Sequence, residues 1–91
     1  MEESEAHDLI ERAFAALAEE DYVRALAIGD QLVAALPDRA VIRAIRAQAL
    51  LGSDAPEESY DEARRAVDLA PEDGHAHRLL AMSKRIRGVG R

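Results

Sequence analysis

Histidine, carboxylate and serine side chains are the groups in this sequence that could carry chemistry, and their spacing favours no catalytic or metal site. His75 and His77 form an H-x-H motif, but side chains two residues apart on a helix point to different sides and cannot share a metal ion. Glu58 and Glu62 are better interpreted as exposed helix charges, with Arg65 as an ordinary ion-pair partner. The serines have no nearby base with an orienting acid, and cysteine is absent. We therefore expect no enzymatic activity, no cofactor and no metal.

The composition argues for one small cytoplasmic domain without nucleic-acid or membrane partners. The chain has 91 residues and a net charge of −6, which disfavours general affinity for phosphate backbones. Its apolar runs fall far short of the ~20 residues that a membrane span needs. The acidic beginning, Met-Glu-Glu-Ser-Glu, does not have the positive region of a secretory signal.

Helix-forming residues dominate, and apolar residues recur at helical spacing throughout, so the sequence predicts an all-α fold. We expect five helices, at about residues 5–19, 22–35, 39–51, 55–70 and 73–88. Ser4, Asp21 and Asp54 are the expected N-caps, and Gly52 is the expected left-handed cap of the third helix.

The pattern of residues repeats every 34 positions. Placing Pro37 over Pro71 aligns the sequence without a gap, and each unit then reads as helix, tight turn, helix. Small residues align where two helices must approach closely, namely Ala13 with Ala47 and Ala81 in the first helix of each unit, and Ala25 with Ser59 in the second.

This period, with its boundary prolines and matched small residues, resembles the tetratricopeptide repeat (TPR) family over roughly residues 6–87. The resemblance implies a right-handed superhelix of two hairpins, residues 6–39 and 40–73, followed by a solvating helix at about 74–88. Glu20 and Asp54 stand where the family has its turn glycine. Basic residues occupy some positions that are typically large and apolar, namely Arg12, Arg43, Arg46 and His77. The alternative is a helical bundle whose period arises by chance.

The resemblance also implies a function. In this family the first helices line a concave groove that binds a peptide or helix of another protein. The groove positions that the resemblance implies are His7, Ile10, Phe14 and Leu17, then Val41, Ala44, Ile45, Gln48 and Leu51, then His75, Arg78, Leu79, Met82 and Arg85. The sequence therefore predicts a protein–protein interaction module of the adaptor, scaffold or chaperone-like kind.

Two alternatives to this use of the groove remain open. The groove could close on another copy of the chain, which would make it a homodimer, or some of these apolar residues could belong to the core. The resemblance does not extend to family members that hold a terminal carboxylate with Lys, Asn and Arg. The matching positions here carry Ile10, Phe14, Ile45, His75 and Leu79.

Charge is unevenly distributed along the chain. Residues 1–21 contain eight acidic side chains against Arg12 alone, whereas residues 75–91 contain five basic side chains and no acidic one. Compensation of helix dipoles and capping of a terminal helix would explain this asymmetry. Association of the basic end of one copy with the acidic end of another is the alternative.

Overall fold

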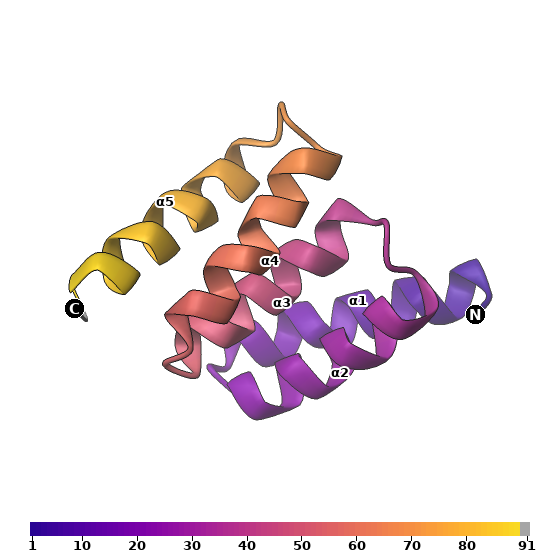
Figure 1. Cartoon of the computed structure of the whole chain (residues 1–91). Helices are drawn as coiled ribbons and strands as arrows, with labels where there is room; N and C mark the ends of the chain where they lie inside the picture. Colours follow the sequence, from indigo (N-terminus) through magenta and orange to yellow (C-terminus); the bar gives the residue numbers. More distant parts are fainter. Residues whose placement is uncertain (90–91) are drawn as a thin grey trace.

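The computed structural model describes residues 1–89 and contains five α-helices joined by short turns (Figure 1). Their bounds are Glu3–Ala18 (α1), Tyr22–Ala35 (α2), Ala40–Gly52 (α3), Pro56–Leu69 (α4) and Gly74–Val89 (α5). Residues 1–89 contain no strand. The predicted all-α class is confirmed, and the predicted bounds of the second helix match those of α2.

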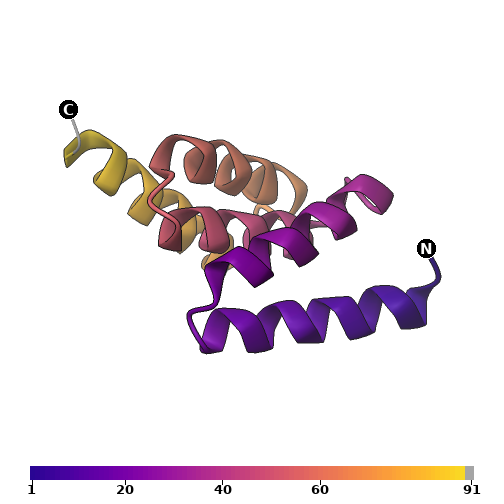
Figure 2. The same ribbon diagram turned by 90° about the horizontal axis from the view of Figure 1, so that it is seen from below.

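Each helix packs against the next along the chain, so that α1 and α2 form one hairpin and α3 and α4 a second, with α5 packed on α4 (Figure 2). Smaller contacts join α1 to α3 and α3 to α5, which makes the first helices of successive units neighbours. Within the described residues α2 and α4 do not touch. The first helices therefore follow one another in order, as a shared binding surface requires.

The turns inside the two hairpins have the same backbone geometry. Glu20 and Asp54 have positive φ angles of 59° and 62° and lie 34 residues apart. In each turn the amide of the following residue donates to the carbonyl five residues earlier, at 2.8 and 2.9 Å. This pattern of a left-handed residue and a six-to-one hydrogen bond is the Schellman helix ending. The period seen in the sequence is thus also a period of the backbone.

The helix endings before the two prolines match as well. Leu36 ends α2 with φ and ψ of −135° and 70°, and Ala70 ends α4 with −140° and 76°. Both residues precede a proline, whose ring disfavours the α conformation in the residue before it. Each still donates its amide to the carbonyl four residues back, at 2.8 and 2.9 Å. Proline therefore ends both second helices by the same mechanism.

The predicted caps are only partly correct. Asp21 caps α2, because its carboxylate accepts a hydrogen bond of 3.2 Å from the Arg24 amide. Ser4 is not a cap, since α1 already begins one residue before it. Gly52 is the last residue of α3 and its φ is not positive; Asp54 adopts the left-handed conformation instead of capping α4. The errors all lie at helix ends, where one residue more or less changes the role.

The core has two parts of different character. Large aliphatic side chains fill the space between α1, α2 and α3; the buried ones are Leu17, Ile28, Leu32, Ile42 and Ile45. Small residues dominate between α3, α4 and α5, where the buried set is Ala44, Ala47, Ala63, Ala66, Ala76 and Leu79. Fully burying a large aliphatic side chain contributes about 1.5–3 kcal/mol, so the first part supplies most of the hydrophobic stabilisation. Among the described helices, none has the length and apolar character needed to cross a bilayer.

Candidate functional site

The candidate site is the surface formed by matched positions of α1, α3 and α5, which we call the first-helix face. Its members, in sets separated by 34 residues, are His7, Val41 and His75; Ile10, Ala44 and Arg78; Phe14, Gln48 and Met82; and Leu17, Leu51 and Arg85. Phe14 and Met82 are each 45% exposed and Val41 is 38% exposed, which is high for large apolar side chains. Arg78 and Arg85 are also exposed, and Ile10, Gln48 and Leu51 are half-buried.

Four of the predicted groove residues belong to the core. Leu17, Ala44, Ile45 and Leu79 are at most 7% exposed and lie in the two buried clusters. Ile45 and Leu79 occupy the same position in two successive units, at which the preceding second helix covers the first helix. These four side chains are not accessible to a partner. Leu17 and Ala44 therefore occupy matched positions without forming part of the accessible first-helix face, which is narrower than the sequence predicts.

The two edges of the first-helix face differ in charge. On α1, Glu3 accepts hydrogen bonds from Arg39, and Glu11 pairs with His7 at 2.8 Å. The hydrogen bond from Arg39 lowers the pKa of Glu3, and the same contact raises the pKa of Arg39. No acidic residue lies between 75 and 88 on α5. The face is therefore acidic and apolar at α1 but basic and apolar at α5.

An internal ion-pair network, which the sequence did not predict, joins α3 to its neighbours. Glu62 is 7% exposed and accepts hydrogen bonds from Arg43 at 3.1 and 3.2 Å, while Arg46 contacts it at 2.7 Å. The prediction that Glu62 is an exposed partner of Arg65 is wrong. Burying a carboxylate between two guanidinium groups is tolerable because each charge is compensated.

Arg46 extends this network to the first hairpin. Its Nε donates to Asp30 of α2 at 2.9 Å, so one side chain bridges α2 and α4. Burial acts to lower the pKa of Arg46, but the hydrogen bond to Asp30 and the charge of Glu62 outweigh it and raise that pKa. No buried side-chain nitrogen or oxygen among the described residues is without a hydrogen-bond partner. The network is thus fully satisfied and serves to hold the two hairpins together.

Basic side chains also fasten the boundaries between units. Arg43 Nε donates to the carbonyl of Pro37 at 3.0 Å, and His77 Nε2 lies 2.6 Å from the carbonyl of Pro71. Both side chains are six residues after a boundary proline, in matching positions of α3 and α5. The sequence signal for these contacts is a pair of basic residues at an aligned position, which by itself indicates only a departure from an apolar pattern.

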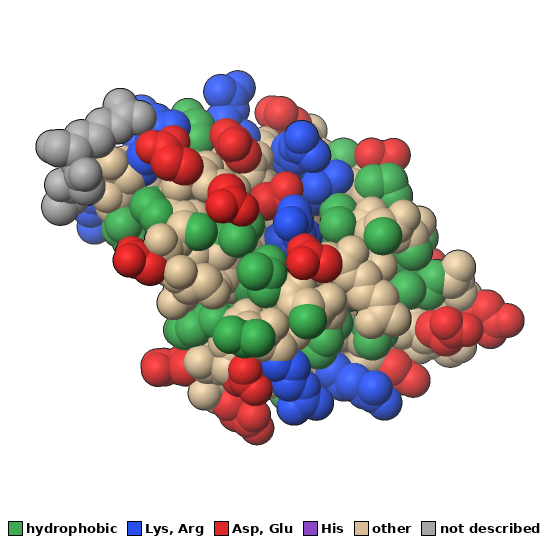
Figure 3. Space-filling model, turned by 60° about the horizontal axis from the view of Figure 1, so that its bottom comes forward, with side chains coloured by type: hydrophobic (Ala, Val, Ile, Leu, Met, Phe, Trp, Pro, Cys, Tyr) green, Lys and Arg blue, Asp and Glu red, His purple; other side chains and the backbone are tan. Residues whose placement is uncertain are grey.

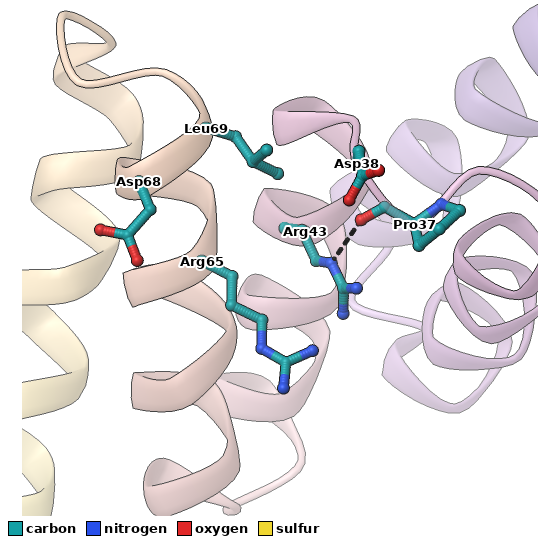
Figure 4. A pocket seen from close by; sticks show the side chains of 6 residues that line it. All are labelled: Pro37, Asp38, Arg43, Arg65, Asp68 and Leu69. Atoms are coloured by element: carbon teal, nitrogen blue, oxygen red, sulfur yellow. Dashed lines mark hydrogen bonds between the residues drawn. The ribbon is translucent and has the colours of Figure 1, made fainter.

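A hollow of about 240 Å³ lies beside this network, between the turn after α2 and the helix α4 (Figure 4). Its lining residues are Pro37, Asp38, Arg43, Arg65, Asp68 and Leu69. Arg43 is already engaged there, and the mixture of two carboxylates with two guanidinium groups gives the hollow no strong preference for an anion or a cation. Within residues 1–89 no three His, Cys, Asp or Glu side chains are grouped closely enough to hold a metal ion.

The surface shown in Figure 3 has no large region of one charge. Acidic and basic side chains lie close together across the middle of this face, with hydrophobic side chains between them. Binding to a phosphate backbone depends on clustered basic side chains, which the surface in Figure 3 does not show.

Comparison with protein-family models finds no match to the chain, and comparison with curated proteins finds none either.

Proposed function

We propose that the chain is a TPR-like protein–protein interaction module that binds a peptide or helix of a partner protein on its first-helix face. The resemblance to this family rests on the 34-residue period of the sequence. Further support comes from the backbone, in which the Schellman turns and the helix endings before proline recur with the same spacing. Its role would be that of an adaptor, a scaffold or a chaperone-like component, without catalysis.

The single observation that carries this proposal is the exposure of Phe14 and Met82. They occupy equivalent positions on α1 and α5, two periods apart, and both are 45% exposed. Val41 adds a third exposed apolar side chain on α3 between them. Burying such side chains against a partner would contribute roughly 0.6–1.4 kcal/mol each, because somewhat less than half of their surface is still accessible.

Capture of partners from a cell lysate on the immobilised chain tests this proposal. Phe14→Asp should abolish the capture of any protein that binds the first-helix face. Val23→Asp is the matched control, because Val23 is 82% exposed on α2 and outside that face. Capture that depends on Phe14 but not on Val23 supports the proposal.

Because Phe14 is partly buried, its replacement must be shown to leave the fold intact. Far-ultraviolet circular dichroism and a thermal melt of each variant provide that check. Met82→Glu is a second variant, at the opposite edge of the face on α5. If folded Phe14→Asp and Met82→Glu chains retain the same bound proteins as the unmodified chain, the first-helix face is not the binding surface.

A further inference from the structure

We propose that the first-helix face pairs with the first-helix face of a second copy of this chain, in a two-fold symmetric dimer. The inference rests on the proposed function, because it names an occupant for the same face. It follows from the order of charges across the three first helices, which is acidic on α1, neutral on α3 and basic on α5.

The acidic edge lies on α1. Helical spacing of 3.6 residues per turn places Glu3, Ile10, Glu11 and Phe14 on one side of this helix. Glu3 and Glu11 are exposed; Arg39 forms an ion pair with Glu3, and His7 Nε2 lies 2.8 Å from a Glu11 carboxylate oxygen. This edge therefore presents the Glu11 carboxylate, together with a Glu3 carboxylate that is paired with Arg39, beside an aromatic ring that is 45% exposed.

The basic edge lies on α5. Arg78, Met82, Arg85 and Ile86 share the side of α5 that corresponds to Phe14 on α1. All four are exposed, and neither guanidinium has an ion-pair partner among the described residues. Arg87 differs, because it pairs with Glu57 at 3.7 Å and lies 3.8 Å above the ring of Tyr60. This edge thus presents two uncompensated positive charges beside two apolar side chains.

A two-fold axis passing near α3 would bring each edge opposite its complement. In a symmetric dimer every contact occurs twice, so α1 of one copy faces α5 of the other and the reverse. Val41 and Gln48 of α3, which have no charge, would then lie near the axis. No like charges are forced together in this arrangement, whereas a parallel pairing would place acidic edges on acidic edges.

The pairing would bury the exposed apolar side chains of both edges. Phe14 and Ile10 of one copy would pack against Met82 and Ile86 of the other, with Glu11 near Arg78 or Arg85. Few large apolar side chains are accessible on this face, so the dimer should be weak and reversible compared with stable complexes, which bury ~800 Å² per partner. A partner protein and the second copy would exclude each other, because both need the same face.

Sedimentation equilibrium of the full chain across a concentration series tests the dimer. The unmodified chain should be dimeric at about 1 mM and dissociate on dilution. Its dissociation constant should rise several-fold between about 50 mM and 500 mM NaCl, since salt screens exposed charge pairs. A chain that remains monomeric at the highest concentration overturns the inference.

Exchanging charges between the edges tests the geometry. Glu3→Lys with Glu11→Lys should give a monomer, and Arg78→Glu with Arg85→Glu should give another. An equal mixture of the two variants should dimerise, because each edge then meets an opposite charge. If the two variants remain monomeric when mixed, or if either alone dimerises as well as the unmodified chain, the two-fold pairing is wrong.

The control matched to Arg78→Glu with Arg85→Glu makes the same change in net charge but outside the first-helix face. Arg24→Glu with Arg64→Glu replaces two exposed arginines on α2 and α4 and should leave the dissociation constant within about twofold of the unmodified value. The two proposals remain separable. A monomeric chain that still captures a partner through Phe14 overturns the dimer and leaves the proposed function intact.

Discussion

Two buried serines between α4 and α5 allow the energetics of the stack to be tested quantitatively. Ser59 Oγ donates to the carbonyl of Ala47 at 2.7 Å, and Ser83 Oγ lies 2.7 Å from Ser59 Oγ. Both serines are fully buried. The matching positions 34 residues earlier are Ala25 and Ala49, also fully buried. Replacing both serines by alanine therefore gives the interface between α4 and α5 the same side chains that the interface between α2 and α3 has at the matching positions.

The hydrogen-bond directions determine the expected sizes of the effects. Because Ser59 donates to a carbonyl, the hydroxyl of Ser83 must be the donor between the two serines. Ser59→Ala leaves that buried hydroxyl without a partner and should cost about 1–3 kcal/mol of unfolding free energy. Ser83→Ala removes one hydrogen bond but leaves Ser59 satisfied, so about 0.5–1.5 kcal/mol is expected.

The double variant should be less destabilised than Ser59→Ala alone. Replacing both partners of a buried hydrogen bond by apolar groups is nearly neutral, so about 0–1 kcal/mol is expected for the pair. Urea unfolding followed by circular dichroism measures all three variants, with Ser4→Ala as an exposed control expected to stay within about 0.5 kcal/mol. Additive losses in the double variant would refute the reasoning, as would a larger loss for Ser83→Ala than for Ser59→Ala.

Three further perturbations follow from the contacts described above. Glu62→Gln should lower the unfolding free energy by about 3 kcal/mol, since the buried guanidinium of Arg43 loses its carboxylate partner and Arg46 keeps only Asp30. Denaturant unfolding measures this, and an unchanged midpoint would contradict it. Glu20→Gly should raise stability by about 0.5–1 kcal/mol and increase the melting temperature, because glycine adopts positive φ without strain. The pKa of Glu3 is lowered from its ordinary value of 4.5 by Arg39, so the stabilisation from their contact is present above that value and is lost as pH falls through the lowered pKa. A carbon-13 titration of Glu3 should show Arg39→Ala restoring the ordinary pKa.

Much of the fold could be predicted because its signals are local and periodic. Apolar spacing located the helices, and Pro37 and Pro71 marked both unit boundaries, since proline constrains the residue before it whatever the tertiary context. The all-α prediction is confirmed. The turn residues were harder to assign, because a carboxylate such as Asp54 can cap a helix or adopt the left-handed conformation, and only the length of the turn decides between these roles.

The site was predicted less completely, since burial depends on which helices meet. Helical spacing put Ile45 and Phe14 on nearby sides of their helices, but α2 covers Ile45 and no preceding helix in the described chain covers Phe14. The sequence pattern marks Arg43 and Arg46 as basic residues at typically apolar positions. Their acidic partner, Glu62, lies on another helix, at a distance along the chain that sequence spacing does not reveal.

The order in which the helices touch has a kinetic consequence. Within the described chain each helix contacts only helices one or two places away in sequence, so no long loop must close before the core can form. Chains with such low contact order fold in microseconds to milliseconds, since little loop entropy is lost before native contacts stabilise the ensemble. We expect stopped-flow refolding to be complete, or nearly so, within the dead time of the instrument. We expect α1, α2 and α3 to order first around the large aliphatic side chains, and α5 to dock last against the alanine-rich surface of α3 and α4.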